Sequence, residues 1–219
     1  MIAAPRRTVA ELMSAPVVAV DELTGVKEVA RLLSERGFNA VPVTTRLGRL
    51  VGVVTEDDLI VRQDPKVQHQ AHFWSDPRRD ERQRARGRVA REVMSHPPMT
   101  IAPDAPASDA AEVMHEHHLK SLPVVDEEGT LVGMITRRDL LKLLTRPDPD
   151  IAEDVVRRLR EESVDMRAIS VEVDRGIVTL TGWVGRAGEA ARLTGCAEAV
   201  DGVVAVRPWI NAEELLELI

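Results

Sequence analysis

Two short stretches of the sequence carry the same chemistry. GVVTEDDL and GMITRRDL lie 81 residues apart, and each places a threonine three positions before an aspartate: Thr55 with Asp58, and Thr136 with Asp139. An apolar run followed by this spacing predicts a strand that ends where a helix starts, with the two side chains forming a capping box. The same helix start offers free N–H groups to a phosphate, and the aspartate could accept both hydroxyls of a ribose. Each corner is therefore either a helix cap or part of a nucleotide site.

The two corners belong to a longer internal repeat. A shift of 81 aligns residues 9–60 with residues 90–141 without a gap. A repeat of this length predicts two copies of one structural unit, each needing the other to bury its apolar face. Identical residues at aligned positions include Glu11/Glu92, Met13/Met94, Ser14/Ser95, Pro16/Pro97, Glu35/Glu116, Pro42/Pro123, Val43/Val124, Gly48/Gly129, Leu50/Leu131, Val51/Val132, Gly52/Gly133 and Leu59/Leu140.

Each copy is predicted to fold in the order β-α-β-β-α. Helical spacing of apolar residues alternates with short runs rich in valine, and Gly48 and Gly129 mark turns between paired strands. A final helix is expected to start at each Thr-x-x-Asp corner. The expected strands and central helices are 17–20, 25–37, 40–44 and 49–55 in the first copy, and 99–101, 107–118, 121–126 and 130–136 in the second.

The repeated pattern, M…P…V, a helix, then VPVV…G.LVG.IT..DL, resembles the CBS domain family, here as the tandem pair called a Bateman module. The resemblance implies a mixed α/β fold, a homodimer, and a regulatory ligand that contains adenosine: AMP, ATP or S-adenosylmethionine. It also implies that Asp58 and Asp139 hold ribose, with Thr55 and Thr136 near the sugar or phosphate. The adenine slots implied by the family are Val18, Val41 and Pro42 in one cleft, and Met99, Leu122 and Pro123 in the other.

The charges inside the two corners differ. Glu56-Asp57 stands between the threonine and the aspartate of the first, and Arg137-Arg138 between those of the second. An anionic phosphate is repelled by the first pair and attracted by the second, with an effect that is small if the side chains point into water. We therefore expect the second cleft to be the better nucleotide site.

Residues 61–88 form an Arg-rich connector between the copies, with eight Lys/Arg against four Asp/Glu. It is either a phosphate-binding patch or, more commonly for such a run, a solvated helix face. Phe73 and Trp74 are expected to anchor it to a domain. Two histidines, His115 and His118, have a spacing that zinc sites use, but the apolar stripe of their helix leaves them facing outward, so no metal site is expected.

A different pattern follows the linker at 145–150, whose two prolines predict a short, restricted tether. An amphipathic helix at 150–162, a hairpin turn at Asp174-Arg175-Gly176, a second helix near 186–200 and a strand at 202–210 give the order α-β-β-α-β. The segment resembles a BON domain, which implies a phospholipid or protein partner. The resemblance rests on structural positions: Val171, Val173, Gly176, Val178, Leu180, Gly182, Val184, Val200, Gly202, Val203 and Val206.

Composition limits the class of protein. A net charge of −7 and 2% aromatic residues argue against a nucleic-acid-coating surface or a base-stacking platform. Cys196 is the single cysteine, and the sequence has no export signal or membrane-spanning run, so a cytoplasmic protein is expected. The common catalytic motifs are absent, so an enzyme is not expected.

The sequence thus predicts a first CBS repeat at 1–60, the connector at 61–88, a second repeat at 89–146 and a BON domain at 150–219. The leading interpretation is a ligand sensor whose CBS pair, on binding, repositions the BON domain. One alternative is a ligand-free scaffold whose BON domain binds lipid or protein. Another is a weak nucleic-acid binder that uses the connector.

Overall fold

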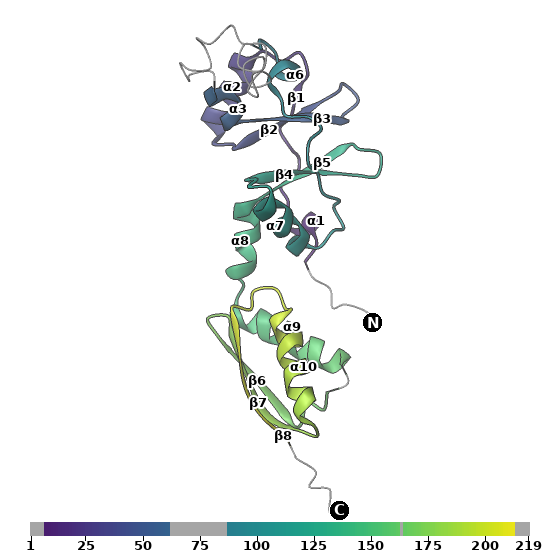
Figure 1. The fold of residues 1–219 in the computed structure, drawn as a ribbon, viewed down its shortest axis with the longest axis vertical. Helices are drawn as coiled ribbons and strands as arrows, with labels where there is room; N and C mark the ends of the chain where they lie inside the picture. The colour runs from purple at the N-terminus through teal and green to yellow at the C-terminus, as the bar shows by residue number, and fades with distance from the viewer. Residues whose placement is uncertain (1–6, 62–86, 163, 213–219) are drawn as a thin grey trace, which may run out of the picture. The chain divides into compact units, whose positions relative to one another are not determined.

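The computed structural model describes residues 7–61, 87–162 and 164–212 (Figure 1). Most of the Arg-rich connector, with Phe73 and Trp74, falls outside these ranges, so what the sequence predicts for it stays a prediction. The described residues form two compact units, residues 8–137 and residues 138–212 together with Arg7. No helix within the described ranges is long and apolar enough to cross a membrane.

The first unit contains the sheets and the central helices of both repeats. In the first repeat β1 pairs in parallel with β2, and β2 pairs antiparallel with β3; in the second, β4 pairs antiparallel with β5. The elements of the first repeat are α1 (Val9–Leu12), β1 (Val20–Asp21), α2 (Val26–Arg36), β2 (Ala40–Thr44), β3 (Leu50–Thr55) and α3 (Glu56–Ile60). Those of the second are α6 (Ala90–Val93), α7 (Ala107–Glu116), β4 (Ser121–Val125), β5 (Leu131–Thr136) and α8 (Arg137–Leu144).

The mixed α/β fold and the repeated order are confirmed, with three differences. The strand expected at 17–20 is the two-residue β1, so it shares only Val20 with the prediction. The strand expected at 99–101 is reduced to an isolated parallel bridge between Ile101 and Val124, the positions equivalent to Val20 and Val43 in the first repeat. Each repeat also starts with a four-residue helix, α1 or α6, that the sequence did not predict. Such a helix makes barely one turn, which is too short to show a 3.6-residue period.

Each repeat completes the other by reciprocal backbone pairing. Ser14 exchanges two hydrogen bonds with Met134, at 2.9 and 3.1 Å, and Ser95 exchanges two with Val53, at 2.8 and 3.1 Å. Because 14 and 95, and 53 and 134, are equivalent positions, the start of each repeat lies on the last strand of the other. This pairing explains why neither copy is expected to be a stable domain alone.

Two glycines make this pairing possible. A Cβ added to Gly52 would overlap the sulfur of Met94, and one added to Gly133 would overlap the sulfur of Met13. Each methionine therefore fills the space that a side chain would need on the strand opposite it. The repeat identities Gly52/Gly133 and Met13/Met94 are thus one packing contact made twice.

The second unit contains a sheet with two helices on one side (Figure 1). Strand β7 lies in the centre, antiparallel to β6 and parallel to β8. The order α-β-β-α-β is confirmed: α9 (Asp148–Glu161), β6 (Ile169–Asp174), β7 (Ile177–Val184), α10 (Ala187–Glu198) and β8 (Ala205–Ala212). Its core consists of Ile151, Val155, Leu159, Ile169, Val178, Leu180, Leu193 and Ala197.

The predicted hairpin turn is present and is held from outside. Arg175 and Gly176 both have positive φ, 49° and 73°, as a two-residue turn of type I′ requires. Asp148, the first residue of α9, accepts hydrogen bonds from the N–H groups of both turn residues, at 2.7 and 2.8 Å. One carboxylate therefore fixes the turn to the start of the helix.

The linker is shorter than the sequence predicted. Helix α9 starts at Asp148 and takes Pro149 into its first turn, where proline is tolerated because the N–H there has no helical partner. Only residues 145–147 then separate α8 from α9. The expectation that both prolines lie in the linker was wrong for this reason.

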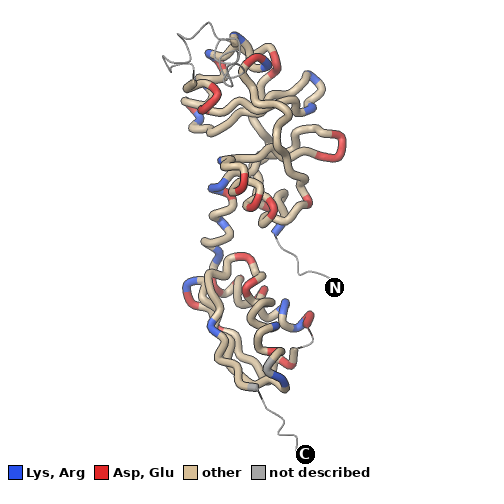
Figure 2. Tube along the Cα trace, viewed as in Figure 1, with Lys and Arg blue, Asp and Glu red and all other residues tan. Residues whose placement is uncertain are grey.

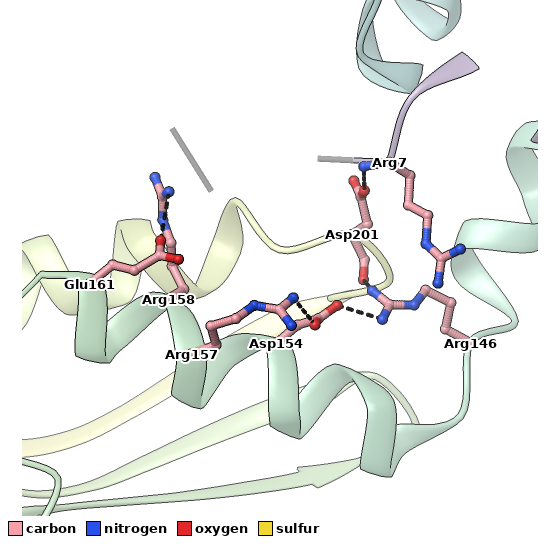
Figure 3. Close-up of polar contacts among 7 residues, drawn as sticks. All are labelled: Arg7, Arg146, Asp154, Arg157, Arg158, Glu161 and Asp201. Carbon is pink, nitrogen blue, oxygen red and sulfur yellow. Dashed lines mark hydrogen bonds and ion pairs between the residues drawn. The ribbon is translucent and has the colours of Figure 1, made fainter. Parts of the chain in front are cut away.

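The linker is also fixed to the second unit by a polar cluster (Figure 3). The Arg146 guanidinium, about 10% exposed, donates to a carboxylate oxygen of Asp154 and to the backbone oxygen of Asp201, both at 2.6 Å. Arg157 pairs with the other oxygen of Asp154. The Arg7 N–H donates to the Asp201 carboxylate at 2.7 Å. A largely buried guanidinium with a carboxylate and a carbonyl partner resists local opening better than an exposed ion pair.

Candidate functional site

The first corner is a capping box. Strand β3 ends at Thr55, whose extended backbone (φ −106°, ψ 168°) caps α3. The Thr55 Oγ1 accepts from the Asp58 N–H at 3.3 Å, and an Asp58 oxygen accepts from the N–H and the hydroxyl of Thr55 at 2.8 and 2.6 Å. The cap interpretation is therefore confirmed for this corner, which does not by itself exclude a ligand there.

A residue from the other repeat also reaches Asp58. The hydroxyl of Ser95 donates to the second carboxylate oxygen at 3.2 Å. Ser95 occupies this place because its backbone pairs with Val53, two positions before Thr55 on β3. In the sequence, Ser14 and Ser95 stand out only as identical residues of the repeat, because the spacing within one copy carries no signal for a contact between copies.

The second corner has different partners. Strand β5 ends at Thr136, and Asp139 is the third residue of α8 and is buried, with 6% of its surface exposed. Lys142, one turn further along the helix, donates to an Asp139 oxygen at 2.6 Å, while its own side chain is about 59% exposed. A buried carboxylate needs such partners, because an unpaired charge away from water is costly.

The sheet register brings the implied adenine-slot residues beside the threonines. Thr55 lies opposite Ala40, which precedes Val41 and Pro42 on β2. Thr136 lies opposite Ser121, which precedes Leu122 and Pro123 on β4. These four slot residues are buried. Val18 and Met99 precede the parallel pairings of Val20 with Val43 and of Ile101 with Val124, and each is 41% exposed. Their roles toward a ligand stay predictions.

The two arginines of the second corner are not equivalent. The Arg137 guanidinium donates to the carbonyl oxygens of Leu119 and Met114, at 2.7 and 3.0 Å, and so closes the end of α7. Two of its five N–H donors are used within the chain, and its charge remains. Arg138 is exposed. The attraction of a phosphate to this corner therefore depends on Arg138 more than the sequence suggested.

The acidic first corner is partly neutralised. Lys120, from the second repeat, lies 3.6 Å from the Glu56 carboxylate, and both side chains are about half exposed. Asp57 is exposed without a basic neighbour on its own helix turn. The electrostatic difference between the corners has the sign that the sequence predicted, and it is smaller than a count of side-chain charges implies.

The described residues contain no other cluster that points to chemistry. They hold no group of three or more His, Cys, Asp or Glu arranged to bind a metal ion. His115 and His118 are exposed. Elsewhere, the Arg88 N–H donates to Glu92 at 2.6 Å and lowers the pKa of that carboxyl below its usual value, at a fully exposed position outside both corners.

Comparison with known proteins identifies the class. The CBS domain family matches residues 9–63 and 90–146, and the BON domain family matches residues 147–211. The chain therefore belongs to the CBS domain family, as a tandem pair followed by a C-terminal BON domain, and the two resemblances are confirmed.

Individual relatives agree over the CBS pair. A CBS domain-containing protein of Dictyostelium discoideum is 30% identical over 138 residues, which cover 63% of this chain and 91% of that protein. The protein MJ0188 of Methanocaldococcus jannaschii is 28% identical over 168 residues, 76% of this chain and 55% of the relative, so the chain spans about half of its length. The crystal structure of CBSX2 in complex with AMP has a TM-score of 0.54 and 25% identity, and covers 62% of this chain and 94% of that chain.

Proposed function

We propose that this protein is a ligand sensor whose CBS pair binds an adenosine-containing molecule, with AMP as the first candidate. The observation that carries the proposal is the likeness of the CBS pair to CBSX2, whose crystal structure contains AMP. The sheet register, which sets the buried slot residues beside Thr55 and Thr136, supports it. ATP and S-adenosylmethionine are the next candidates.

Binding is proposed to favour the second corner. At the first corner, the first turn of α3 adds two further acidic residues beside Asp58. At the second, Lys142 and Arg138 supply positive charge beside Asp139. A phosphate-bearing ligand gains from that difference in proportion to how far the site excludes water.

The proposed role is regulatory and not catalytic. Helix α8 directly follows Thr136. The short linker after it, residues 145–147, contains Arg146, which contacts Asp154 and Asp201. A change in α8 on ligand binding would reach the BON domain through few rotatable bonds. The BON domain would then alter its contacts with a protein or phospholipid partner. We further propose a homodimer, since α3 and α8 expose Ile60, Leu141 and Leu144. A cytoplasmic location is proposed from the single cysteine, Cys196.

The satisfied carboxylate of the first corner favours a second candidate function for that corner. There the capping box and the Ser95 contact can be purely structural. In the extreme case both corners are structural, and the protein is a scaffold that acts through its BON domain.

Mass spectrometry of small molecules released from freshly purified protein, followed by calorimetric titration of AMP, ATP and S-adenosylmethionine, separates these possibilities. The sensor proposal predicts an adenosine compound in the released fraction and saturable binding of at least one of the three. An empty protein that binds none of them at millimolar concentration would leave the scaffold.

Transmission to the BON domain has its own test. Hydrogen exchange with and without AMP should show ligand-dependent protection in α8 and in residues 145–154, and Arg146→Ala should abolish the part beyond residue 145 without changing AMP affinity. If protection with AMP stays within residues 9–137 in both proteins, the BON domain does not respond to the ligand.

A further inference from the structure

The outer face of the BON sheet is the side that α9 and α10 do not cover (Figure 1). Alternate residues of the strands point to it, and those of β6 are exposed while their neighbours are buried or half-buried. Two large aromatic side chains lie on this face: Trp183 is 61% exposed and Trp209 is 70% exposed. The chain has three tryptophans in all and no tyrosine, so two of its few aromatic residues lie here.

The register places the two indoles together. Trp209 on β8 lies opposite Thr181 on β7, and Trp183 is two residues further along β7, on the same face. Diagonal neighbours on adjacent strands are within reach of aromatic side chains. The low aromatic content of the sequence gave no indication of this pair. Exposed, adjacent indoles are typical of the centre of a binding surface.

One acid and one base lie in a single row across the sheet, to one side of the aromatic pair. Glu172 on β6 lies opposite Thr179 on β7, which in turn lies opposite Arg207 on β8. Both charged side chains are exposed, and neither makes an ion pair with the part of the chain that the structure describes. The row therefore carries a negative group at one edge and a positive group at the other, with β7 midway between them.

The charge of the domain disfavours a polyanionic occupant. Residues 147–211 contain twelve Asp/Glu and eight Lys/Arg, and basic residues are interspersed with acidic ones along the domain (Figure 2). Nucleic acid or an anionic lipid surface would require a predominantly basic face. A self-complementary partner needs only equal numbers of each sign, as in the Glu172–Arg207 row.

The edge of the sheet formed by β8 is a poor place for strand addition. Pro208 lies in the middle of β8, opposite Leu180. A proline in a strand has no N–H to donate, and it is accommodated where the missing donor would face away from the sheet. The free edge of β8 therefore lacks a donor at its centre, which disfavours strand pairing through that edge.

We propose that this face binds the same face of a second copy of the chain. A two-fold axis parallel to β7 would place Glu172 of one copy against Arg207 of the other, twice, and would bring the Trp183 side chains together at the centre. A two-fold contact of this kind must be complementary to itself. The proposal does not depend on ligand binding by the CBS pair, and it is separate from any dimer formed through α3 and α8.

Charge reversal in the full-length protein tests the contact without disturbing the core. In a Trp74→Phe background, the fluorescence of the remaining indoles reports only Trp183 and Trp209. We expect their quenching by acrylamide to fall as protein concentration rises, in step with the mass measured by sedimentation. Glu172→Arg alone and Arg207→Glu alone should each weaken this association by about tenfold or more, because like charges then meet at both contacts.

The decisive experiment mixes the two single variants. In a mixed pair, opposite charges meet at both contacts. An equimolar mixture should therefore regain the association and the shielding of the indoles. A charge interaction within one copy cannot produce this recovery. A mixture no better than the separate variants would overturn the proposal. Indoles that stay quenchable at all concentrations, or that become shielded only with anionic vesicles or a single-stranded oligonucleotide, would overturn it as well.

Discussion

The two strand-to-helix corners of the CBS pair share a sequence pattern and differ in the burial of their carboxylates and in the charges beside them. Asp58 is half-buried and is bound by Thr55 and by Ser95 of the other repeat, whereas Asp139 is buried and is bound by Lys142. The same pattern therefore places one carboxylate against neutral donors, and the other, which is buried, beside the exposed ammonium group of Lys142. Repeated residues fix the backbone corner, and the residues that are not repeated decide its electrostatics.

The largest effect on stability is expected where the repeats are alike. Gly52→Ala and Gly133→Ala should each lower the free energy of unfolding by about 1–3 kcal/mol, because the new methyl group displaces a packed methionine. Urea denaturation followed by circular dichroism measures the loss. Gly195→Ala, where a methyl group would meet nothing within 4 Å, is the control and should cost nothing. A large loss at only one of the two glycines would show that the reciprocal packing is not equivalent.

Arg137 belongs only to the second corner, and its structural role can be separated from its charge. Arg137→Ala should cost about 1–2 kcal/mol of stability, because two carbonyl oxygens near the end of α7 lose their donor. Arg137→Lys keeps the charge but loses the forked geometry. If Arg137 acts on a ligand only through its charge, the lysine variant should bind AMP like wild type while remaining less stable. Unchanged stability in both variants would contradict the capping role.

The capping box is expected to contribute about 1 kcal/mol, typical of an N-cap side chain. Thr55→Ala removes the hydroxyl that accepts from the Asp58 N–H and donates to the Asp58 carboxylate. Thr55→Ser retains the hydroxyl and should restore most of the stability. Chemical denaturation of the three proteins measures the difference, and equal losses for alanine and serine would assign the effect to the lost methyl group instead.

The smallest effect is expected at the ion pair of the second corner. The Lys142 side chain is more than half exposed, so water screens its interaction with Asp139, and Lys142→Ala should cost no more than about 0.5–1 kcal/mol. Raising the salt concentration should reduce the difference between wild type and variant further. A loss of several kcal/mol would indicate that Asp139 is left as an uncompensated buried charge.

Much of this architecture could be predicted from the sequence, and the residues show why the rest could not. The repeat, the apolar periodicity and the turn glycines specify the helices and strands, and the Thr-x-x-Asp spacing specifies the corners. The contact of Ser95 with Asp58 could not be predicted, since it depends on one repeat lying on the other. Trp183 and Trp209 are diagonal neighbours because β7 and β8 pair in parallel, and α10 separates these two strands in the sequence. No local spacing encodes that register.

At the linker, a prediction made from the sequence was wrong. Two prolines near 147 and 149 are a usual sign of a linker, yet Pro149 lies inside α9 because the first turn of a helix does not need its N–H. Arg146 then fixes what remains to Asp154 and Asp201. A reading of composition alone therefore gave too long a tether.

Calorimetric titration of AMP into wild type, Asp58→Ala and Asp139→Ala tests the central claim most directly. If Asp139 holds the ribose hydroxyls, its loss removes two charge-assisted hydrogen bonds, and the affinity should fall by about 100-fold. Asp58→Ala, matched in size and chemistry at the equivalent position, should change the affinity by less than about threefold. If Asp58→Ala abolishes binding and Asp139→Ala leaves it intact, the assignment of the ligand to the second corner is wrong.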